Sequence, residues 1–478
     1  MHADYLGLNG KNKSVLILNL KFHLRYQHLN FVCLTSSGDH LNSMIKPKER
    51  LFITWGDCTD QGPYIWTFAD FDQRKHFKVT YNPEAPDHKD NDGCARICQK
   101  QLEKYIDDLD KEIVAIRFSD PDGDISVSTA LEEDMTEYGN NHPLPTFGFS
   151  MPVETISVED LTELDRLGPQ VDLVSYQGRS VGGAKYFKKA IFKYWWLLND
   201  MHRPWEEAGC WARLPRDHPH IVSFDKMVLE PIDHKPIGFT TQFIKGGTLS
   251  NKGTTTRPFR LQWFRQLLAV VDDLNYTYGI MHQNITPRNL IIDEQDNLRI
   301  LNFDCAWMIR QLNHRPEQDD LAGVMLTLYE LITLDSSLRR SLHTEQDIEA
   351  LLRQDWAKHP SVQLDREVCD FRNLLGEWAE ERKRRLFARR GTWIRWEGMP
   401  DCSLTPRILP IPEDFESITR IEPRDSSVWR QTLVELQIPF WEWERPASYS
   451  LWGALENDHT ADDEDEIADG VNFRCEPM

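Results

Sequence analysis

The strongest constraint on the fold of this chain is one change in hydrophobic periodicity. Between residues 171 and 244, short runs rich in β-branched and aromatic residues predict strands, with one helix after Asn199. Beyond them, apolar residues recur at helical spacing along residues 264–274 and again along residues 321–332. Strands followed by helices predict an α+β fold in which a small β-rich lobe precedes a larger helical lobe.

Weaker signals divide the rest of the chain. Strand-type runs from residue 14 to about residue 85, a helix around Leu102 and a strand at Ile113–Phe118 predict an N-terminal α+β extension without assignable chemistry. Residues 143–152 are rich in proline, and residues 456–469 are densely acidic. The predicted parts are an accessory α+β domain (1–140), a linker (141–165), a bilobal domain (166–390), an extension packed on that domain (391–450) and a disordered acidic tail (451–478).

Composition limits the classes of function. The chain has 478 residues, with 55 Lys and Arg against 76 Asp and Glu, so its formal charge is −21. This charge argues against general binding to nucleic acid or to an anionic membrane. No apolar run reaches the roughly 18 residues of a membrane-spanning helix, and the nine scattered cysteines do not suggest a disulfide framework. We expect an intracellular protein, cytoplasmic or nuclear, with an unidentified protein partner.

The most informative motif follows the first helical segment. Residues 282–289 read His-Gln-Asn-Ile-Thr-Pro-Arg-Asn, and Asn-Phe-Asp follows a strand-type run at residues 302–304. These segments resemble the catalytic loop and the D-F-G segment of protein kinases in residue type and spacing. By this resemblance Asn284 stands at the position of the catalytic base, His282 is a packed residue of the same loop, and Asn289 belongs to the nucleotide site.

Further segments match the same family in order. Residues 190–193 resemble the strand whose lysine holds the phosphates, so the resemblance implies that Lys193 binds ATP. Glu207 stands where a kinase places the glutamate that pairs with this lysine. Thr241 and Gln242 lie in a segment similar to the hinge between the lobes, with Thr241 at the back of the adenine pocket.

Asp320 resembles the buried aspartate that anchors the kinase catalytic loop. The resemblance covers residues 168–385, and it implies a bilobal protein-kinase-like fold with nucleotide bound between the lobes. The wording of the motifs is most similar to a fungal (FunK-type) group of kinase-like proteins, which commonly has an N-terminal extension.

Both acidic positions of the motifs are amides here. Asn284 can form hydrogen bonds but cannot accept a proton near neutral pH, and losing a positioned acid–base group typically costs about 10² to 10⁴ in rate. Asn302 replaces the carboxylate that holds Mg²⁺, a hard cation bound mainly by carboxylates and phosphates, so weak Mg²⁺ binding is expected. Asp304, two residues later, could supply a carboxylate if the backbone shifted; a solvated turn is the alternative.

Two other departures concern loops. Only 17 residues separate Asn302 from Asp320, without the A-P-E segment of protein kinases. This short segment resembles that of small-molecule kinases of the aminoglycoside and choline type, and the resemblance implies that the acceptor need not be a protein. Gly178, Gly182 and Gly183 lie before Lys193 as a degenerate phosphate-covering loop, with an ordinary hairpin turn as the alternative.

Two segments near the C-terminus have alternative readings. The basic run 382–385 is expected to be a solvated helix end, with a nuclear import signal or a partner patch as the alternative. The aromatic cluster 440–446 is expected to pack back on the bilobal domain, with peptide binding as the alternative.

Three functions remain open from the sequence. The departures favour a pseudokinase with a scaffold or regulatory role and weak or absent ATP binding. The second hypothesis is an active ATP-dependent phosphotransferase whose metal is recovered by Asp304. The third is an interaction protein whose pocket binds no nucleotide.

Overall fold

The computed structural model of the chain contains two compact units. We call residues 50–136 with 442–478 the α+β unit, and residues 1–49 with 137–441 the bilobal unit. The strands expected before residue 45, the proline-rich stretch, Gly182, Gly183 and the acidic tail lie outside the described residues. The structure describes residues 45, 47–58, 62–83, 91–139, 153–179, 185–197, 202–250, 257–308, 320–340, 348–388 and 427–447.

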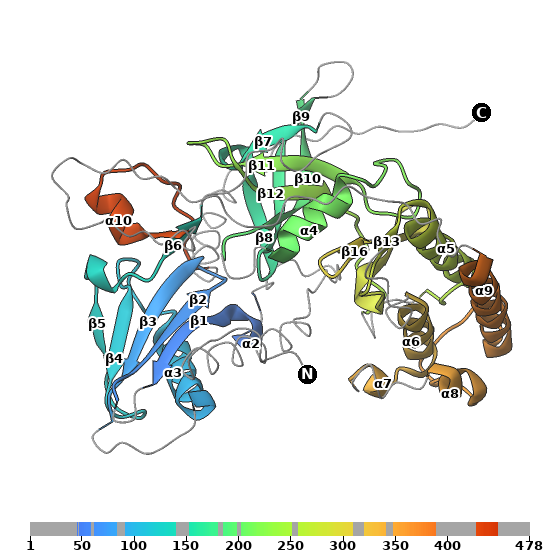
Figure 1. Cartoon of the computed structure of the whole chain (residues 1–478), viewed down its shortest axis with the longest axis horizontal. Helices are drawn as coiled ribbons and strands as arrows, with labels where there is room; N and C mark the ends of the chain where they lie inside the picture. The colour runs from blue at the N-terminus through green and yellow to red at the C-terminus, as the bar shows by residue number, and fades with distance from the viewer. Residues whose placement is uncertain are drawn as a thin grey trace, which may run out of the picture. The chain divides into compact units, whose positions relative to one another are not determined.

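The α+β unit is a five-stranded sheet with one long helix, α3, against it (Figure 1). The strands follow chain order across the sheet, and neighbours are antiparallel except β3 and β4. Because parallel neighbours need a crossover connection, the chain between them passes through α3. The short helix α2 (Pro47–Arg50) ends at the first residue of this unit. The elements that follow are β1 (Leu51–Cys58), β2 (Tyr64–Asp70), β3 (Lys75–Tyr81), α3 (Asn91–Tyr105), β4 (Ala115–Phe118), β5 (Ser126–Ser128) and η1 (Leu131–Glu133).

The core of this unit uses the helix face that the sequence predicted. Cys94, Cys98 and Leu102 recur every four residues along α3, and each is fully buried. Phe68 and Phe77 of the sheet are buried to the same extent. The α+β prediction for this part of the chain is therefore confirmed from Leu51 onward.

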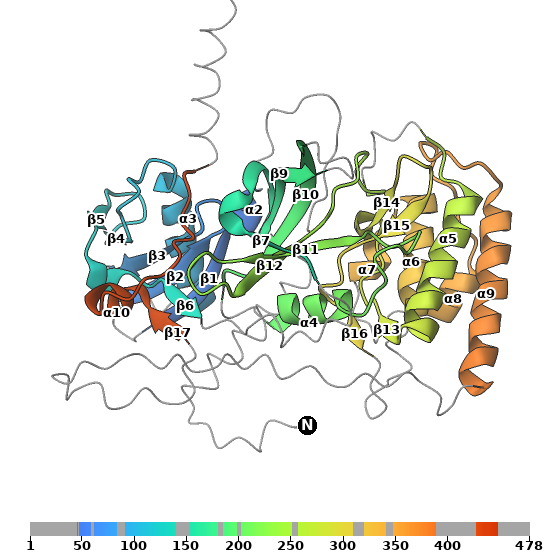
Figure 2. The same ribbon diagram turned by 90° about the horizontal axis from the view of Figure 1, so that it is seen from above.

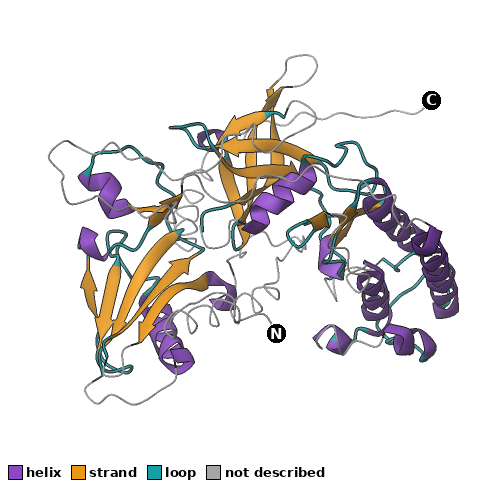
Figure 3. Cartoon of the chain, in the orientation of Figure 1, coloured by secondary structure: helices purple, strands orange, loops and turns teal. Residues whose placement is uncertain are grey.

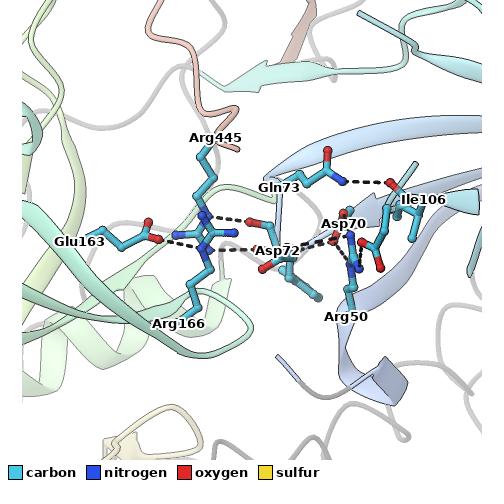
Figure 4. Close-up of polar contacts among 10 residues, drawn as sticks. Arg50, Asp70, Asp72, Gln73, Ile106, Glu163, Arg166 and Arg445 are labelled. Carbon is cyan, nitrogen blue, oxygen red and sulfur yellow. Dashed lines mark hydrogen bonds and ion pairs between the residues drawn. The ribbon is translucent and has the colours of Figure 1, made fainter. Parts of the chain in front are cut away.

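The aromatic cluster 440–446 was predicted to pack on the bilobal domain. Its residues from 442 onward belong instead to the α+β unit. Arg445 lies on the turn between β2 and β3 of the α+β unit (Figure 4). Its backbone N–H donates to the carbonyl oxygen of Gln73 at 3.0 Å. Its guanidinium donates to the carbonyl oxygens of Asp72 (2.7 Å) and Phe71 (3.2 Å). These charge-assisted bonds hold the segment on the turn.

The part before residue 442 pairs with a strand that the sequence analysis assigned to the accessory domain 1–140. The strand β17 (Ser427–Trp429) pairs with β6 (Glu137–Gly139) in the bilobal unit, and α10 (Arg430–Glu435) follows it. The described part of the predicted extension, residues 427–447, is thus divided between the two units.

His76 of β3 gives the α+β unit a stability that depends on pH. Its side chain is buried, and burial lowers its pKa from 6.5 to about 4, while the charge of Asp134 acts in the opposite direction. Between these two pH values the unfolded chain binds a proton that the folded unit excludes. The free energy of unfolding should therefore fall as the pH decreases through this window, by up to roughly 3 kcal/mol from this group.

Urea unfolding at pH 7 and at pH 4.5 checks this prediction with the variant His76→Gln. We expect the variant to lose less stability on acidification than the wild type, because its side chain does not titrate. The exposed residue His359 provides the control: His359→Gln should keep the wild-type pH dependence. Equal acid sensitivity in His76→Gln and the wild type would contradict the prediction.

The bilobal unit begins with a six-stranded sheet in the spatial order β7-β11-β12-β10-β9-β8 (Figure 1). The neighbours are antiparallel except β7 and β11. The elements are β7 (Thr155–Ser157), η3 (Val158–Asp160), β8 (Thr162–Gly168), β9 (Val171–Arg179), β10 (Lys185–Tyr194), α4 (His202–Trp211), β11 (Phe224–Leu229) and β12 (Pro236–Gln242).

This sheet begins earlier than predicted. The sequence predicted a linker at residues 141–165. The strand β7 lies inside this range, and β8 begins inside it and extends beyond its end. The strand β8 is an edge strand rich in charged residues, and its Leu164 is 40% exposed, so no clear alternation of apolar residues revealed it.

The second lobe is helical, with α5, α6 and α9 packed together (Figures 2 and 3). Among the described residues no helix combines the length and apolar character needed to cross a membrane. The elements are α5 (Leu261–Asp272), the π-helical turn η5 (Asp273–Thr277), β13 (Ile280–Met281), η6 (Pro287–Asn289), β14 (Leu290–Ile292), β15 (Leu298–Ile300), β16 (Trp307–Met308), α6 (Asp320–Thr333), α7 (Ser337–Arg340), α8 (Ile348–Arg353) and α9 (Val368–Ala388).

Arg382 corrects the expectation of a solvated basic run. It is 1% exposed, and its guanidinium donates to Asp272 Oδ1 at 2.7 Å and to Asn275 Oδ1 at 2.6 Å. The ring of Trp378 lies 4.7 Å from the guanidinium carbon. This residue therefore joins α9 to the end of α5, and its partners could not be read from the local sequence.

Candidate functional site

A cavity in the bilobal unit brings together residues from both lobes. It encloses about 700 Å³ of empty space, part of which is open to solvent. Its apolar walls include Leu167, Val171, Ile191, Ile291 and Leu301. Six of the residues predicted from the kinase resemblance also line it: Lys193, Glu207, Thr241, Gln242, Asn289 and Asn302.

Lys193 and Glu207 form an ion pair at the inner end of the cavity. Lys193 Nζ lies 2.5 Å from Glu207 Oε2, and the other carboxylate oxygen accepts the backbone N–H of Phe303 at 3.1 Å. Glu207 is 2% exposed, and burial raises its pKa while the charge of Lys193 lowers it. The pairing is the one that the resemblance implied.

A chain of three amides continues from this lysine. Asn302 Oδ1 accepts a second hydrogen bond from Lys193 Nζ at 2.7 Å, and Asn302 Nδ2 donates to Asn289 Oδ1 at 3.3 Å. Asn289 Nδ2 then donates to the carbonyl oxygen of Asn284 at 2.7 Å. Asn302 has a φ of +68°, a left-handed conformation that asparagine tolerates better than most residues.

The side chain of Asn284 lies between two opposite charges. Its Nδ2 donates to Asp304 Oδ1 at 3.4 Å, and its Oδ1 accepts from Arg288 at 3.3 Å. An amide suits this place because it offers one donor and one acceptor. Burial lowers the pKa of Arg288, and the negative charge of Asp304 acts in the opposite direction.

Arg288 was not singled out from the sequence. It stands immediately before Asn289 inside the catalytic-loop motif, so its position in the motif was the available signal. Its contact with Asn284 became visible only in the structure.

Asp320 holds the backbone of the catalytic loop. It is 2% exposed, and its carboxylate accepts the backbone N–H groups of His282 and Gln283, each at 2.8 Å. Asn275 Nδ2, on the π-helical turn, donates to the same carboxylate at 2.8 Å. Because Asn275 also accepts from Arg382, this network joins α9 to the loop.

His282 is a packed residue of the loop. Its ring is fully buried, lies 4.9 Å from the ring of Phe303, and is within 3.1 Å of the carbonyl oxygen of Leu301 through Nε2. Its contacts are with the scaffold, and burial lowers its pKa. The ring of Phe303 also meets that of Trp211 edge-on at 4.8 Å, which connects α4 with the loop.

Of the three glycines proposed as a phosphate-covering loop, Gly178 is the one that lies in the described part of the chain. Gly178 is inside β9 opposite Tyr186, whereas the cavity adjoins the other end of that strand, where Val171 pairs with Lys193. The turn next to the cavity is the β8–β9 turn at Pro169 and Gln170. Gly178 is thus part of the β9–β10 hairpin, which was the alternative, whereas the turn next to the cavity contains a single glycine, Gly168, before Pro169.

Two amides, Asn302 and Asn289, stand at the position where the resemblance places the metal. The side-chain oxygen of Asn302 accepts from an ammonium group, and that of Asn289 accepts from an amide, so both oxygens face hydrogen-bond donors. Across the described part of the chain, no group of three or more His, Cys, Asp and Glu side chains could hold a metal ion. Mg²⁺ is usually held by one or two carboxylates together with phosphate oxygens and water, and Asn302 and Asn289 offer amide oxygens instead.

Comparison with known proteins gives partial similarity to kinases. No family model matches the chain. It is 32% identical over 99 residues, 20% of each chain, to CBL-interacting serine/threonine-protein kinase 19 of Arabidopsis thaliana. It is 32% identical over 89 residues, 18% of this chain and 19% of the other, to CBL-interacting serine/threonine-protein kinase 2 of the same plant.

A further similarity, to CBL-interacting protein kinase 15 of Oryza sativa subsp. japonica, is 29% identity over 108 residues, 22% of this chain and 23% of the other. The chain therefore spans about a fifth of the length of the curated relatives it matches. Together with the mixed α+β bilobal unit and its loop architecture, these partial similarities indicate that the chain contains a protein-kinase-like domain.

Proposed function

We propose that this chain is a pseudokinase: a kinase-like protein that does not transfer phosphate and acts as a scaffold or regulator, with weak or absent ATP binding. The observation that supports the proposal is the amide network around Lys193. Its ammonium is shared between Glu207 and the amide oxygen of Asn302, at 2.5 and 2.7 Å. We further propose that it belongs to the fungal kinase-like group, is intracellular, and acts through a protein partner.

The chemistry of the loop supports the same proposal. Phosphoryl transfer is catalysed by positioning and by charge stabilisation, which the metal ions mainly supply. Here the position of the base is held by Asn284, whose amide is engaged by Asp304 and Arg288. With amides at the positions of the base and of the metal ligand, the site retains the loop of a kinase but lacks the two carboxylates that react or bind metal at those positions.

An active phosphotransferase is the second candidate, and one observation favours it. Asp304 lies beside the side chain of Asn284, 3.4 Å from Nδ2, so a carboxylate is present within the loop region. In this candidate Asp304 would recover the metal or take the proton of the acceptor.

A phosphate-transfer assay separates the two candidates. Purified full-length chain is incubated with labelled ATP and either Mg²⁺ or Mn²⁺, with itself, a generic protein and small hydroxyl compounds as acceptors. We expect no transfer above that of Lys193→Ala, because the base and the metal ligands are absent. Transfer that disappears in both Lys193→Ala and Asp304→Asn would overturn the pseudokinase proposal.

Restoring the carboxylates should not create activity. In Asn284→Asp the new carboxylate would face Asp304, which now accepts from the Asn284 amide at 3.4 Å, and two such like charges disfavour ionisation. We therefore expect the double variant Asn284→Asp with Asn302→Asp to remain inactive in the same assay. Activity gained by this double variant would show that the two amides alone account for the inactivity.

A further inference from the structure

The C-terminal segment 442–447 lies on the α+β unit as a bound peptide would. Residues 438–447 are neither helix nor strand, and Arg445 contacts the turn at Asp72, 373 positions earlier in the chain. We propose that this turn, residues 71–74, is a peptide-binding site for an extended segment with an arginine two residues after a tryptophan. Residues 442–447 occupy the site in cis, and a partner protein that presents the same pattern competes for it. The proposal does not depend on whether the chain transfers phosphate.

Backbone carbonyl oxygens of the turn hold the guanidinium of Arg445 (Figure 4). Its Nε donates to the carbonyl oxygen of Asp72 at 2.7 Å, and its Nη2 donates to that of Phe71 at 3.2 Å. In lysine the atom at the place of Nε is a carbon without a donor, so an ammonium cannot form both bonds from the same positions. The two successive carbonyl groups therefore favour arginine over lysine.

A main-chain hydrogen bond sets the register of the segment on the turn. The backbone N–H of Arg445 donates to the carbonyl oxygen of Gln73 at 3.0 Å. In peptide recognition such main-chain bonds give affinity, and the side-chain contacts supply the specificity. The turn thus offers the carbonyl oxygens of residues 71, 72 and 73 to a single residue of the segment.

Trp443 is a second side chain of the segment that contacts the turn. The guanidinium carbon of Arg74 lies 5.6 Å from the centre of the Trp443 ring, which is within the range of a cation–π interaction. Residues two apart point to the same side of an extended chain, so Trp443 and Arg445 reach one surface together. This spacing defines the ligand as a tryptophan, any one residue and then an arginine.

The turn is held in shape by bonds that do not involve the segment (Figure 4). Asp70 is fully buried, and its carboxylate accepts the backbone N–H of Asp72 at 2.9 Å. Nε and Nη2 of Arg50 donate to the two oxygens of the same carboxylate at 2.9 and 3.0 Å. The side chain of Gln73 donates to the carbonyl oxygen of Ile106 at 3.2 Å. Because these bonds lie within residues 50–136, the site is preorganised, and a peptide loses less free energy on binding to it.

Covalent attachment makes residues 442–447 a competitor for any free peptide. A ligand joined to its receptor through a flexible connection acts at an effective concentration of about a millimolar. The wild-type chain should therefore bind a free copy of the segment weakly. A chain whose own segment lacks the tryptophan and the arginine should bind the same peptide well.

Fluorescence anisotropy tests the proposal on the full-length chain with a labelled synthetic peptide of residues 442–447. The double variant Trp443→Ala with Arg445→Ala should bind this peptide at least about tenfold more tightly than the wild type, because the competing segment is lost. No binding to the double variant at millimolar concentration, or equal binding to the two chains, overturns the proposal. Slow hydrogen exchange of the β3 amides shows that the unit is folded in both chains.

Matched changes assign the binding to the turn. The peptide with Arg445→Lys should bind the double variant about tenfold more weakly than the unchanged peptide does. Adding Arg74→Ala to the double variant should weaken binding of the unchanged peptide about threefold. Arg384→Ala is the control, because this side chain is 74% exposed on α9, and it should bind the peptide as the wild type does. Equal affinity for the lysine and arginine peptides overturns the proposal.

A single variant keeps the test decisive if the double variant does not fold. Arg445→Lys retains the charge and most of the side chain, and it should bind the unchanged peptide more tightly than the wild type does; equal binding overturns the proposal. Light scattering tests which chain supplies the segment, and we expect the wild type to be a monomer. A wild-type dimer that the peptide dissociates would show that a second copy supplies it, which overturns occupancy in cis.

Discussion

Replacing Asp320 with alanine is expected to lower the free energy of unfolding of the bilobal unit by about 3 to 5 kcal/mol. The carboxylate is 2% exposed and accepts from the backbone N–H groups of His282 and Gln283 and from the side chain of Asn275, each at 2.8 Å. Alanine removes the acceptor of three buried donors. Each unsatisfied donor costs about 1 to 3 kcal/mol, and the loop can recover only part of this by moving toward water.

Hydrogen exchange and urea unfolding measure this effect separately. In Asp320→Ala the amides of residues 282 and 283 should exchange faster, and the urea midpoint of the bilobal unit should fall. Asp355→Ala is the control, because Asp355 is fully exposed and its ion pair with Arg372 lies at the surface, so it should change neither measurement. Unchanged exchange at residues 282 and 283 would show that Asp320 does not hold the loop.

Replacing Lys193 with alanine is the second large change, and it is expected to cost about 3 to 5 kcal/mol at pH 7. Glu207 is 2% exposed and would keep its negative charge in a buried place without the ammonium that now lies 2.5 Å away. Burial already raises the pKa of Glu207, and losing Lys193, which lowers it, should raise it further.

The pH dependence of the Lys193→Ala effect follows from this shift. Since the folded-state pKa of Glu207 then lies above that of the unfolded chain, the variant loses stability as the pH rises between these two values. Acidification from pH 7 to 5 should therefore reduce the difference in the free energy of unfolding between the variant and the wild type. A difference that grows on acidification would contradict this account.

A second substitution provides the control for Lys193→Ala. Glu207→Gln removes the buried charge and keeps an oxygen that can accept the N–H of Phe303. The double variant should be more stable than Lys193→Ala alone, which a double-mutant cycle by urea unfolding would show. If adding Glu207→Gln lowers the free energy of unfolding further, the destabilisation by Lys193→Ala does not come from the buried charge of Glu207 left without its partner.

Much of the fold could be predicted from the sequence because burial leaves a periodic record. The helix face at Cys94, Cys98 and Leu102, the helix α5 and the strands β9 and β10 follow the expected pattern closely. The strand β8 was not predicted because it lies at the edge of the sheet, where charged residues replace the alternation of apolar and polar residues.

The sequence predicted those residues of the candidate site that belong to motifs with a recognisable spacing. Lys193, Glu207 and Asn302 are far apart in the chain, yet the resemblance placed them together, and the structure joins them through Lys193 Nζ. Contacts that no motif encodes, such as Arg288 with Asn284, required the fold itself.

The sequence by itself determined the residue types at the loop: amides at 284 and 302, and therefore the absence of carboxylates at both places. The tertiary structure decided what those amides contact, which turn adjoins the cavity, and where Arg382 and Arg445 bind. The physical reason is that periodicity records only whether a side chain is buried, whereas the identity of its partner depends on packing between segments that are distant in the chain.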